Sequence, residues 1–476
     1  MIIPNNFHKI SVLYTARAIY FCCKLPHLYY MKILIKSFVT FCFLLIPFSA
    51  IAEGISIVRD EETEKYLNDI SSPVFTAAKL EPNSIKIFIV NSPVLNAFVA
   101  GGQNMFINTG LMILSNDPSL LIGVMAHETG HISGGHLIRK LDEASEAGFK
   151  ATLGYILGAA SVAAGAPPAA GMAIMQGGQH IAERQFLKHS REHEESADQA
   201  ALNILEQIGT SPAGLLELLE KLNAEQRTVY GDLNPYIQTH PLSSERVSHV
   251  RAALNNLSNV DVPTKKDLKS RHMRIVAKLR GFIEKPEKVL EDFPESDNSL
   301  PARYARAIAY YRIPELKKAI SETNSLIEDF PEDPYFYELK GQILFENGYV
   351  DESIIYYKKT TAMLQNSVLP RLELATAQLA SQHDMSNEAA ENLEKVILYD
   401  PENAFAWHQL GIAYGRSGRL GLSYLALAEK AALSGNKEDV IKMMNLAKKN
   451  IPAGFPIEVR EKDIIKTLEK VTGKKD

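Results

Sequence analysis

Cysteine is nearly absent from this chain of 476 residues. The sequence holds three cysteines, and all of them, Cys22, Cys23 and Cys42, lie within the first 52 residues. Without that segment the chain has no disulfide and no thiolate metal ligand, which excludes a disulfide-stabilised scaffold. The fold therefore has to rely on hydrophobic cores, and 46% hydrophobic residues in a chain of this length suit two or three globular domains.

The first 52 residues have the features of an export signal. Residues 31–36 form a basic start, residues 37–48 are apolar, and the segment ends in Ala-Ile-Ala, a small-x-small cleavage pattern. The apolar run is shorter than the roughly 20 residues that span a bilayer. We therefore expect a signal peptide at residues 31–52, preceded by an upstream extension at residues 1–30 that contributes no domain.

Positive charge is in deficit once this segment is removed. Residues 1–52 carry five of the 51 Lys and Arg residues and none of the 56 Asp and Glu residues. The remaining chain has 46 positive and 56 negative side chains, so its formal net charge is 46 − 56 = −10. This balance argues against binding to nucleic acid and against nonspecific binding to anionic lipid.

Charge of either sign is missing from residues 151–182, which are mostly Ala, Gly, Met and Ile. Pro167 and Pro168 divide this uncharged segment into runs of 16 and 14 residues, whereas about 20 residues are needed to cross a bilayer. A helical hairpin therefore fits better than a membrane span. The hairpin has three interpretations: a mobile lid, a surface that touches membrane, or plain buried helices.

The most informative feature that is present is the string HETGH, formed by residues 127–131 in an apolar stretch. Residues four apart on a helix lie about 40° apart around its axis, so His127 and His131 point at one spot. Two neutral imidazoles and a carboxylate make a three-ligand zinc site with a fourth position open for water. Glu128 is then free to accept a proton from that water. The alternative is a core helix with two internally hydrogen-bonded histidines.

A third histidine does not complete the site within the same helix. The extended motif HExxHxxGxxH needs a histidine at position 137, where the chain has Leu137. His136 would lie about 140° around a continued helix from His131, so the helix would not aim it at the metal. The third ligand is therefore expected from a second helix.

Glu194 and Asp198 repeat the four-residue spacing on a later, acidic helix. We expect Glu194 to be the third ligand. Asp198, one turn later on the same face, suits a carboxylate that holds a ligand imidazole through its other ring nitrogen. Two alternatives stay open: Glu192 or Glu195 could be the ligand, or the acidic run could be a solvated helix start.

These residues resemble the gluzincin peptidases of the HtpX and CAAX-prenyl-protease type. Residues 96–111 are similar to the Gly-turn hairpin of that family, and residues 239–242, with Arg246 beyond, are similar to its His-Pro segment. The resemblance covers roughly residues 60–255. It implies one Zn²⁺ per chain and peptidase activity.

The segments before HETGH also predict strands from their own pattern. Residues 85–90 read as a mostly buried strand, and residues 96–108 as two short apolar runs around Gly101 and Gly102, typical of a hairpin. An exposed edge strand in a zinc peptidase can bind substrate by strand addition. An ordinary structural hairpin is the alternative.

His240 is a candidate catalytic residue with more than one interpretation. Its ring could hydrogen-bond the oxyanion of the tetrahedral intermediate. It could instead bind zinc itself and block the water site, or it could be a loop histidine before a proline.

The C-terminal half contains an internal repeat. Aligning residues beyond 263 on themselves gives an offset of 70, which places Pro331, Tyr337, Gly341 and Gly348 on Pro401, Trp407, Gly411 and Gly418. Intermediate units give a period near 34–35 residues, and the pattern at residues 407–414 resembles tetratricopeptide repeats. Stacked helical hairpins of this kind expose a concave groove for peptides or partners. A generic helical array is the alternative.

Together these features predict a mostly α fold with a small β-sheet. We expect a gluzincin-type zinc metalloprotease domain at residues 53–258, then an α-solenoid, with a linker helix and tetratricopeptide-like repeats, at residues 259–476.

This order resembles the BepA type of periplasmic zinc proteases of Gram-negative bacteria. The resemblance implies degradation of unfolded or misassembled outer-membrane β-barrel proteins, assistance to their assembly, and docking on the assembly machinery through the repeats. A peripheral membrane contact is also compatible. The alternatives are a chaperone or adaptor with a structural zinc, and a membrane-embedded peptidase.

Overall fold

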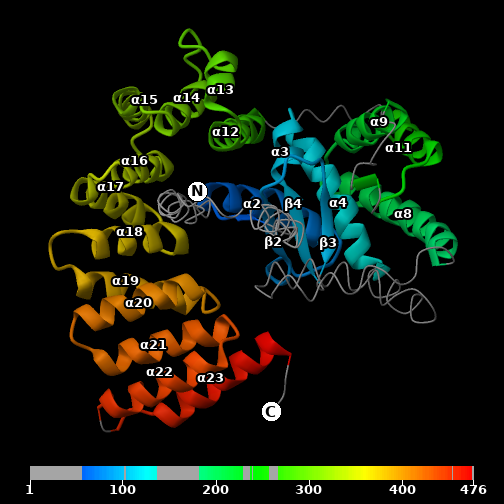
Figure 1. The fold of residues 1–476 in the computed structure, drawn as a ribbon. Coiled ribbons are helices and arrows are strands. Elements are labelled where there is room, and N and C mark those ends of the chain that lie inside the picture. Colours follow the sequence, from blue (N-terminus) through cyan, green and yellow to red (C-terminus); the bar gives the residue numbers. More distant parts are fainter. Residues whose placement is uncertain are drawn as a thin grey trace, which may run out of the picture.

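The structure is a computed structural model that describes residues 56–100, 103–136, 182–228, 236–237, 240–256, 266–452 and 454–473. The expected upstream extension and signal peptide, the turn at Gly101 and Gly102, and residues 151–181 of the uncharged segment lie outside the described residues. No helix in the described ranges is long and apolar enough to span a bilayer. The described residues form many helices and one small sheet, which confirms the expected fold class (Figure 1).

The sheet has four strands in the order β1-β2-β4-β3. They are β1 (Ile57–Val58), β2 (Lys86–Val90), β3 (Ala97–Ala100) and β4 (Asn104–Asn108). β3 and β4 pair antiparallel with Ala97 opposite Ile107, as a hairpin requires, and β2 runs parallel to β4. β3 therefore forms one edge of the sheet, on the side where helix α4 packs.

Helix α4 is the centre of the peptidase part. The helices around the sheet are α2 (Glu61–Ala77), α3 (Thr109–Leu114), α4 (Pro118–Ser133), α8 (Ala182–Gln207), α9 (Ala213–Thr228) and α11 (Ser244–Asn256). The Asp117 side chain caps α4 by accepting a 3.0 Å hydrogen bond from Ser119 N, and Pro118 takes the first helical position. Helices α2, α8 and α9 pack against α4, which buries it on almost every side because its residues are apolar all round.

The C-terminal half is an array of paired antiparallel helices. Their bounds are α14 (Leu300–Arg312), α15 (Leu316–Asp329), α16 (Pro334–Glu346), α17 (Val350–Met363), α18 (Val368–Ala380), α19 (Ser386–Tyr399), α20 (Ala404–Arg416), α21 (Leu420–Leu433), α22 (Lys437–Asn450) and α23 (Ile457–Thr472). The first helices of successive pairs begin at residues 300, 334, 368, 404 and 437, in steps of 34, 34, 36 and 33 residues. Successive helices pack on one another, as in a solenoid, except that the last helix, α23, packs more on α21 than on α22.

Equivalent contacts support the offset of 70 residues found in the sequence. Tyr337 donates from its hydroxyl to the carbonyl of Pro331 at 3.0 Å. Trp407 donates from Nε1 to the carbonyl of Pro401 at 2.9 Å. Two different aromatic side chains thus tie the start of a helix to the proline that precedes it in two copies of one unit, so the internal repeat is structural.

Helix α12 (Lys266–Ile283) joins the array to the peptidase part, and the short helix α13 (Pro286–Asp292) follows it. Helix α12 packs on α2, α3 and α4 on one side and on α14 on the other (Figure 1). A buried ion pair crosses this junction, since Lys278 Nζ lies 2.6 Å from Asp60 and 3.1 Å from Glu62. Tyr304 of the array also donates to Glu62 at 2.8 Å. The first helices of the array therefore share one core with the peptidase part.

Candidate active site

Helix α4 places three of the predicted site residues side by side in the interior. The side chains of His127 and Glu128 are 0% and 1% exposed, and His131 is 6% exposed. The Nε2 atoms of His127 and His131 lie 3.1 Å apart, so the one-turn spacing does aim both rings at one spot. Two buried imidazole nitrogens at this distance need a proton or a cation between them.

Helix α8 brings Glu194 to the same spot because it approaches α4 closely at Gly130. A Cβ atom at this glycine would lie 2.8 Å from the carbonyl oxygen of Ala197, closer than side chains tolerate. The glycine of HETGH thus lets the two backbones touch. Glu194 then reaches His127 Nε2 with one carboxylate oxygen at 3.2 Å and His131 Nε2 with the other at 3.4 Å.

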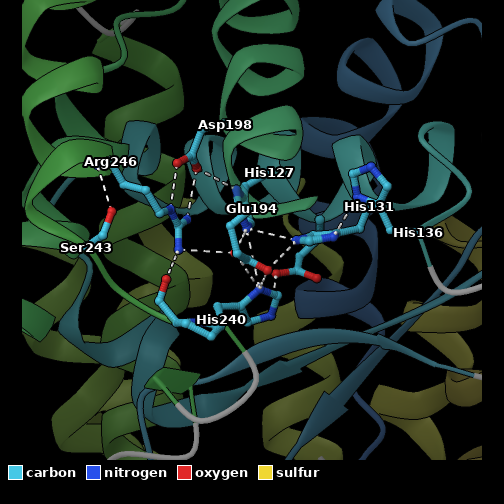
Figure 2. A network of polar contacts seen from close by, with 10 residues as sticks. His127, His131, His136, Glu194, Asp198, His240, Ser243 and Arg246 are labelled. Atoms are coloured by element: carbon cyan, nitrogen blue, oxygen red, sulfur yellow. Dashed lines mark hydrogen bonds and ion pairs between the residues drawn. The ribbon is translucent and has the colours of Figure 1, made fainter. Parts of the chain in front are cut away.

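His240 supplies a fourth donor from the loop before α11. Its Nδ1 lies 3.2 Å from both carboxylate oxygens of Glu194 and 3.4 Å from His127 Nε2. One ligand atom each from His127, His131, Glu194 and His240 lies within 4.8 Å of all the others, and all four residues are buried (Figure 2). The described residues contain no second cluster of this kind.

The spacing of these four donors fits a tetrahedral metal ion. Bonds of about 2.0–2.1 Å from a central Zn²⁺ place its ligand atoms about 3.3–3.4 Å apart. The separations of 3.1, 3.2 and 3.4 Å between His127 Nε2 and the other three donors are close to those edges, and all four donor atoms lie within 4.8 Å of one another. Three imidazole nitrogens and one carboxylate are also a donor set that divalent transition metals favour. The site therefore has the geometry and the chemistry of a metal centre.

Glu128 lies at the rim of this cluster and is not one of the four donors. Its Oε1 is 3.4 Å from Nε2 of His240, the ring nitrogen that faces away from Glu194. The carboxylate is therefore close to the position of the fourth donor and buried among apolar neighbours of α4. A general base beside a metal-bound water has to occupy such a place.

Asp198 holds the opposite edge of the His127 ring. Its Oδ1 lies 2.8 Å from His127 Nδ1. Arg246 donates to both oxygens of the Asp198 carboxylate, from Nε at 2.7 Å and from Nη2 at 2.9 Å. Burial would raise the pKa of Asp198, but the adjacent Arg246 and His127 outweigh it and lower the pKa to about 2. The carboxylate is therefore ionised and accepts from the ring.

Two other groups of the cluster are shifted toward their ligand forms, but His127 is not. Burial lowers the pKa of His127, and the adjacent Asp198 and Glu194 outweigh burial and raise it to about 9. Burial opposes the charge of Glu194, but the three surrounding histidines hold its pKa well below the usual range. Burial lowers the pKa of His131 well below its ordinary value. At neutral pH Glu194 is thus ionised and His131 is neutral, which are their ligand forms.

The structure brings together every site residue predicted from the sequence. His127, Glu128, His131, Glu194, Asp198 and His240 all belong to this cluster or touch it. Glu192 and Glu195, the alternative ligands, are exposed on α8 and outside the four-donor cluster.

Three contributing residues were missed. Arg246 was named beyond the His-Pro segment at residues 239–242 but was assigned no role. Tyr236 stacks on the ring of His240 with centroids 4.6 Å apart. His136 was set aside by its helical rotation, yet its Nδ1 lies 3.1 Å from His131 Nδ1. The one sequence signal for these three residues was the basic side chain of Arg246, six positions after His240.

Residues 61–254 match the model of peptidase family M48. The chain is 24% identical over 405 residues to "Beta-barrel assembly-enhancing protease" of Escherichia coli (strain K12), covering 84% of this chain and 81% of that protein. The protein of the same name from Yersinia pestis is 24% identical over 403 residues, with 84% and 82% covered. "Metalloprotease LoiP" of Escherichia coli (strain K12) is 27% identical over 199 residues, or 40% of this chain and 71% of that protein. The first two similarities extend beyond the matched domain into the helical array.

Proposed function

We propose, from the match of residues 61–254 to the model of peptidase family M48, that the chain is an exported zinc endopeptidase of the periplasm. Its substrates are unfolded or misassembled outer-membrane β-barrel proteins, whose assembly it also assists. The buried cluster of His127, His131, Glu194 and His240 carries the catalytic part of this proposal. The names of the relatives that align with most of the chain support the biological part.

His127, His131 and Glu194 would hold the zinc ion, and Glu128 is the general base. A zinc ion held there would supply Lewis-acid chemistry for a water molecule and the scissile carbonyl. Glu128 accepts a proton from the attacking water and passes it to the nitrogen of the leaving amine, so that the peptide bond is replaced by a carboxylate and a free amine. Asp198, held by Arg246, keeps the His127 ring in its ligand orientation.

His240 closes the site in the conformation described. Its Nδ1 lies 3.2 Å from Glu194, where it would take the fourth position at a metal in place of water, and Tyr236 packs on its ring. Hydrolysis therefore requires the His240 ring to swing away. Once displaced, the imidazole stays on the same loop and can donate a hydrogen bond to the developing oxyanion.

The helical array consists of tetratricopeptide-like repeats that dock on the machinery of barrel assembly. Its period of 33 to 36 residues and its proline-to-aromatic contacts support this assignment. Helix α12 and the buried Lys278–Asp60 pair fix the array to the peptidase part. A partner held by the array is thus kept at a defined position relative to the metal site.

The decisive experiment measures zinc stoichiometry together with degradation of a denatured β-barrel protein. Wild-type protein is expected to hold one zinc and to cleave the substrate. Glu128→Gln should keep the zinc and lose cleavage, whereas Glu195→Gln, a matched change at an exposed acid of α8, should retain both. Wild-type protein without zinc, or retained cleavage by Glu128→Gln, would overturn the assignment.

A second candidate function is a chaperone or adaptor with a structural metal. It is favoured by one observation: with His240 as fourth donor the cluster has the closed form typical of structural sites. In a strain that lacks the native protein, Glu128→Gln would then restore barrel assembly as well as wild type although cleavage is absent. Failure of that variant to restore assembly excludes this candidate.

A further inference from the structure

His136 and His193 form a pair of buried rings beside the metal cluster, and the proposed reaction uses neither. They are 2% and 8% exposed. We infer that His136 is a positioning residue whose ring fixes the orientation of His131, a role that rests on the proposed ligation of the metal by His131. His193 in turn holds the ring of His136.

The ring of His131 has one nitrogen toward the cluster and one toward His136 (Figure 2). Nε2 faces Glu194 at 3.4 Å, whereas Nδ1 lies 3.1 Å from Nδ1 of His136. A neutral imidazole that ligates through Nε2 carries its proton on Nδ1. His131 therefore donates from Nδ1, and Nδ1 of His136 accepts.

A sharp turn in the chain delivers His136 to this place. Helix α4 ends at Ser133, and Gly135 adopts a φ of +61°, a backbone conformation that favours glycine. The chain thus leaves the helical path before His136. On a continued helix the ring would lie about 140° around the axis from His131, and the contact could not form.

Helix α8 secures the ring from the other side. His193 stacks on His136 with centroids 4.5 Å apart and ring planes inclined by 14°. His193 directly precedes Glu194, so the helix that supplies the carboxylate donor also packs on the partner of His131. The ring of His136 is held between His131, at a centroid distance of 5.1 Å, and His193.

The two histidines of α4 are therefore oriented by different chemistry. His127 faces an ionised carboxylate, Asp198, at 2.8 Å, while His131 faces the imidazole of His136. Partners of metal-bound histidines commonly contribute about 10- to 100-fold to metal affinity. Removing the acceptor at position 136 should accordingly weaken metal binding.

The test uses two substitutions of similar size in the full chain, His136→Asn and His136→Leu. The Asn side-chain oxygen can take the place of Nδ1 and accept from His131, whereas Leu cannot. Zinc affinity is measured by competition with a chromophoric chelator, and the visible absorption spectrum of the cobalt form reports ligand geometry. We expect His136→Leu to bind zinc about 10- to 100-fold more weakly than His136→Asn and to shift the cobalt bands.

Thermal melting of the metal-free variants shows whether both fold. If His136→Leu does not, His136→Ala replaces it as the variant without an acceptor. Equal zinc affinities and equal cobalt spectra for the acceptor and non-acceptor variants would overturn the role of His136. If the wild-type protein still binds zinc, the proposed function is unaffected by that result. A wild-type protein that binds no zinc overturns both.

Discussion

The Nδ1 atom of His127 lies 2.8 Å from Oδ1 of Asp198, on the edge of the ring that faces away from the four metal donors. Arg246 grips the same carboxylate with two hydrogen bonds and reaches Glu194 at 3.1 Å with Nη1. One arginine thus fixes both a donor and the partner of a donor. The orientation of His127 therefore depends on the charge of Arg246, which acts on the ring through Asp198.

Replacing Asp198 with Asn tests that dependence. The amide keeps the shape of the carboxylate but removes the charge that Arg246 and His127 share, so zinc affinity should fall about 10- to 100-fold. Chelator competition measures the change. Glu206→Gln, at an exposed acid on the same helix, is the control and should bind like wild type. An Asp198→Asn protein with wild-type affinity would contradict the orienting role.

The predictable part of this site was set by local spacing. One-turn separations place His127 with His131, and Glu194 with Asp198, before any tertiary structure is known. The convergence of the two helices was inferred from a resemblance, and its physical basis is the close contact at Gly130. His136 could not be predicted, because its place depends on the left-handed turn at Gly135 and not on helical periodicity.

In the array, too, one feature could be predicted from the sequence and another could not. Its repeat of 70 residues was visible because Pro331 and Pro401 fall on equivalent positions. The contact between the array and the peptidase part could not be seen in the sequence. Lys278 and Asp60 are separated by more than two hundred residues, and no periodic pattern links them. Periodicity reveals units that pack on copies of themselves, and it says nothing of how such a stack meets another surface.

His240→Ala should open the metal site. Removal of the ring frees the fourth coordination position, so cleavage of an unfolded substrate should become faster while zinc binds more weakly. An increase of about tenfold corresponds to the loss of a closed state favoured by about 1.4 kcal/mol. Initial rates on a fluorogenic casein measure it. Tyr236→Phe, which keeps the stacked ring, serves as the comparison and should remain near wild type.

The opposite result is equally informative. Loss of cleavage in His240→Ala with full zinc occupancy would mean that His240 acts in the reaction more than it blocks the site, as the stabilising donor to the oxyanion.

Gly130→Ala should force α4 and α8 apart. The added Cβ would lie 2.8 Å from the carbonyl oxygen and 3.0 Å from the Cα of Ala197, and backbone atoms cannot rotate aside. We expect a loss of about 1–3 kcal/mol in the free energy of unfolding and weaker zinc binding, because Glu194 moves with α8. Urea denaturation of the metal-free protein measures the first effect. Gln199→Ala, on the exposed side of α8, should cost much less, and equal losses would contradict the close-contact explanation.

The junction between array and peptidase part should weaken in acid. Burial tends to raise the pKa of Asp60, but Lys278 outweighs it, and the pKa falls from 3.8 to about 2. A carboxylate with a lowered pKa in the folded state contributes stability above its unfolded value, and this is lost as the pH falls toward 2. Asp60→Asn keeps an N-cap on α2, as Asn also caps helices, but removes this pH-dependent contribution.

The stability gap between wild type and Asp60→Asn should therefore be near its full value at pH 5 and shrink as the pH approaches 2. Urea denaturation across that range measures it. Asp69→Asn on the same helix breaks the exposed pair with Arg271 and should cost less than about 1 kcal/mol at any of these pH values, because solvent screens surface ion pairs. A gap for Asp60→Asn that does not change with pH would show that Lys278 and Asp60 do not hold the junction by their charges.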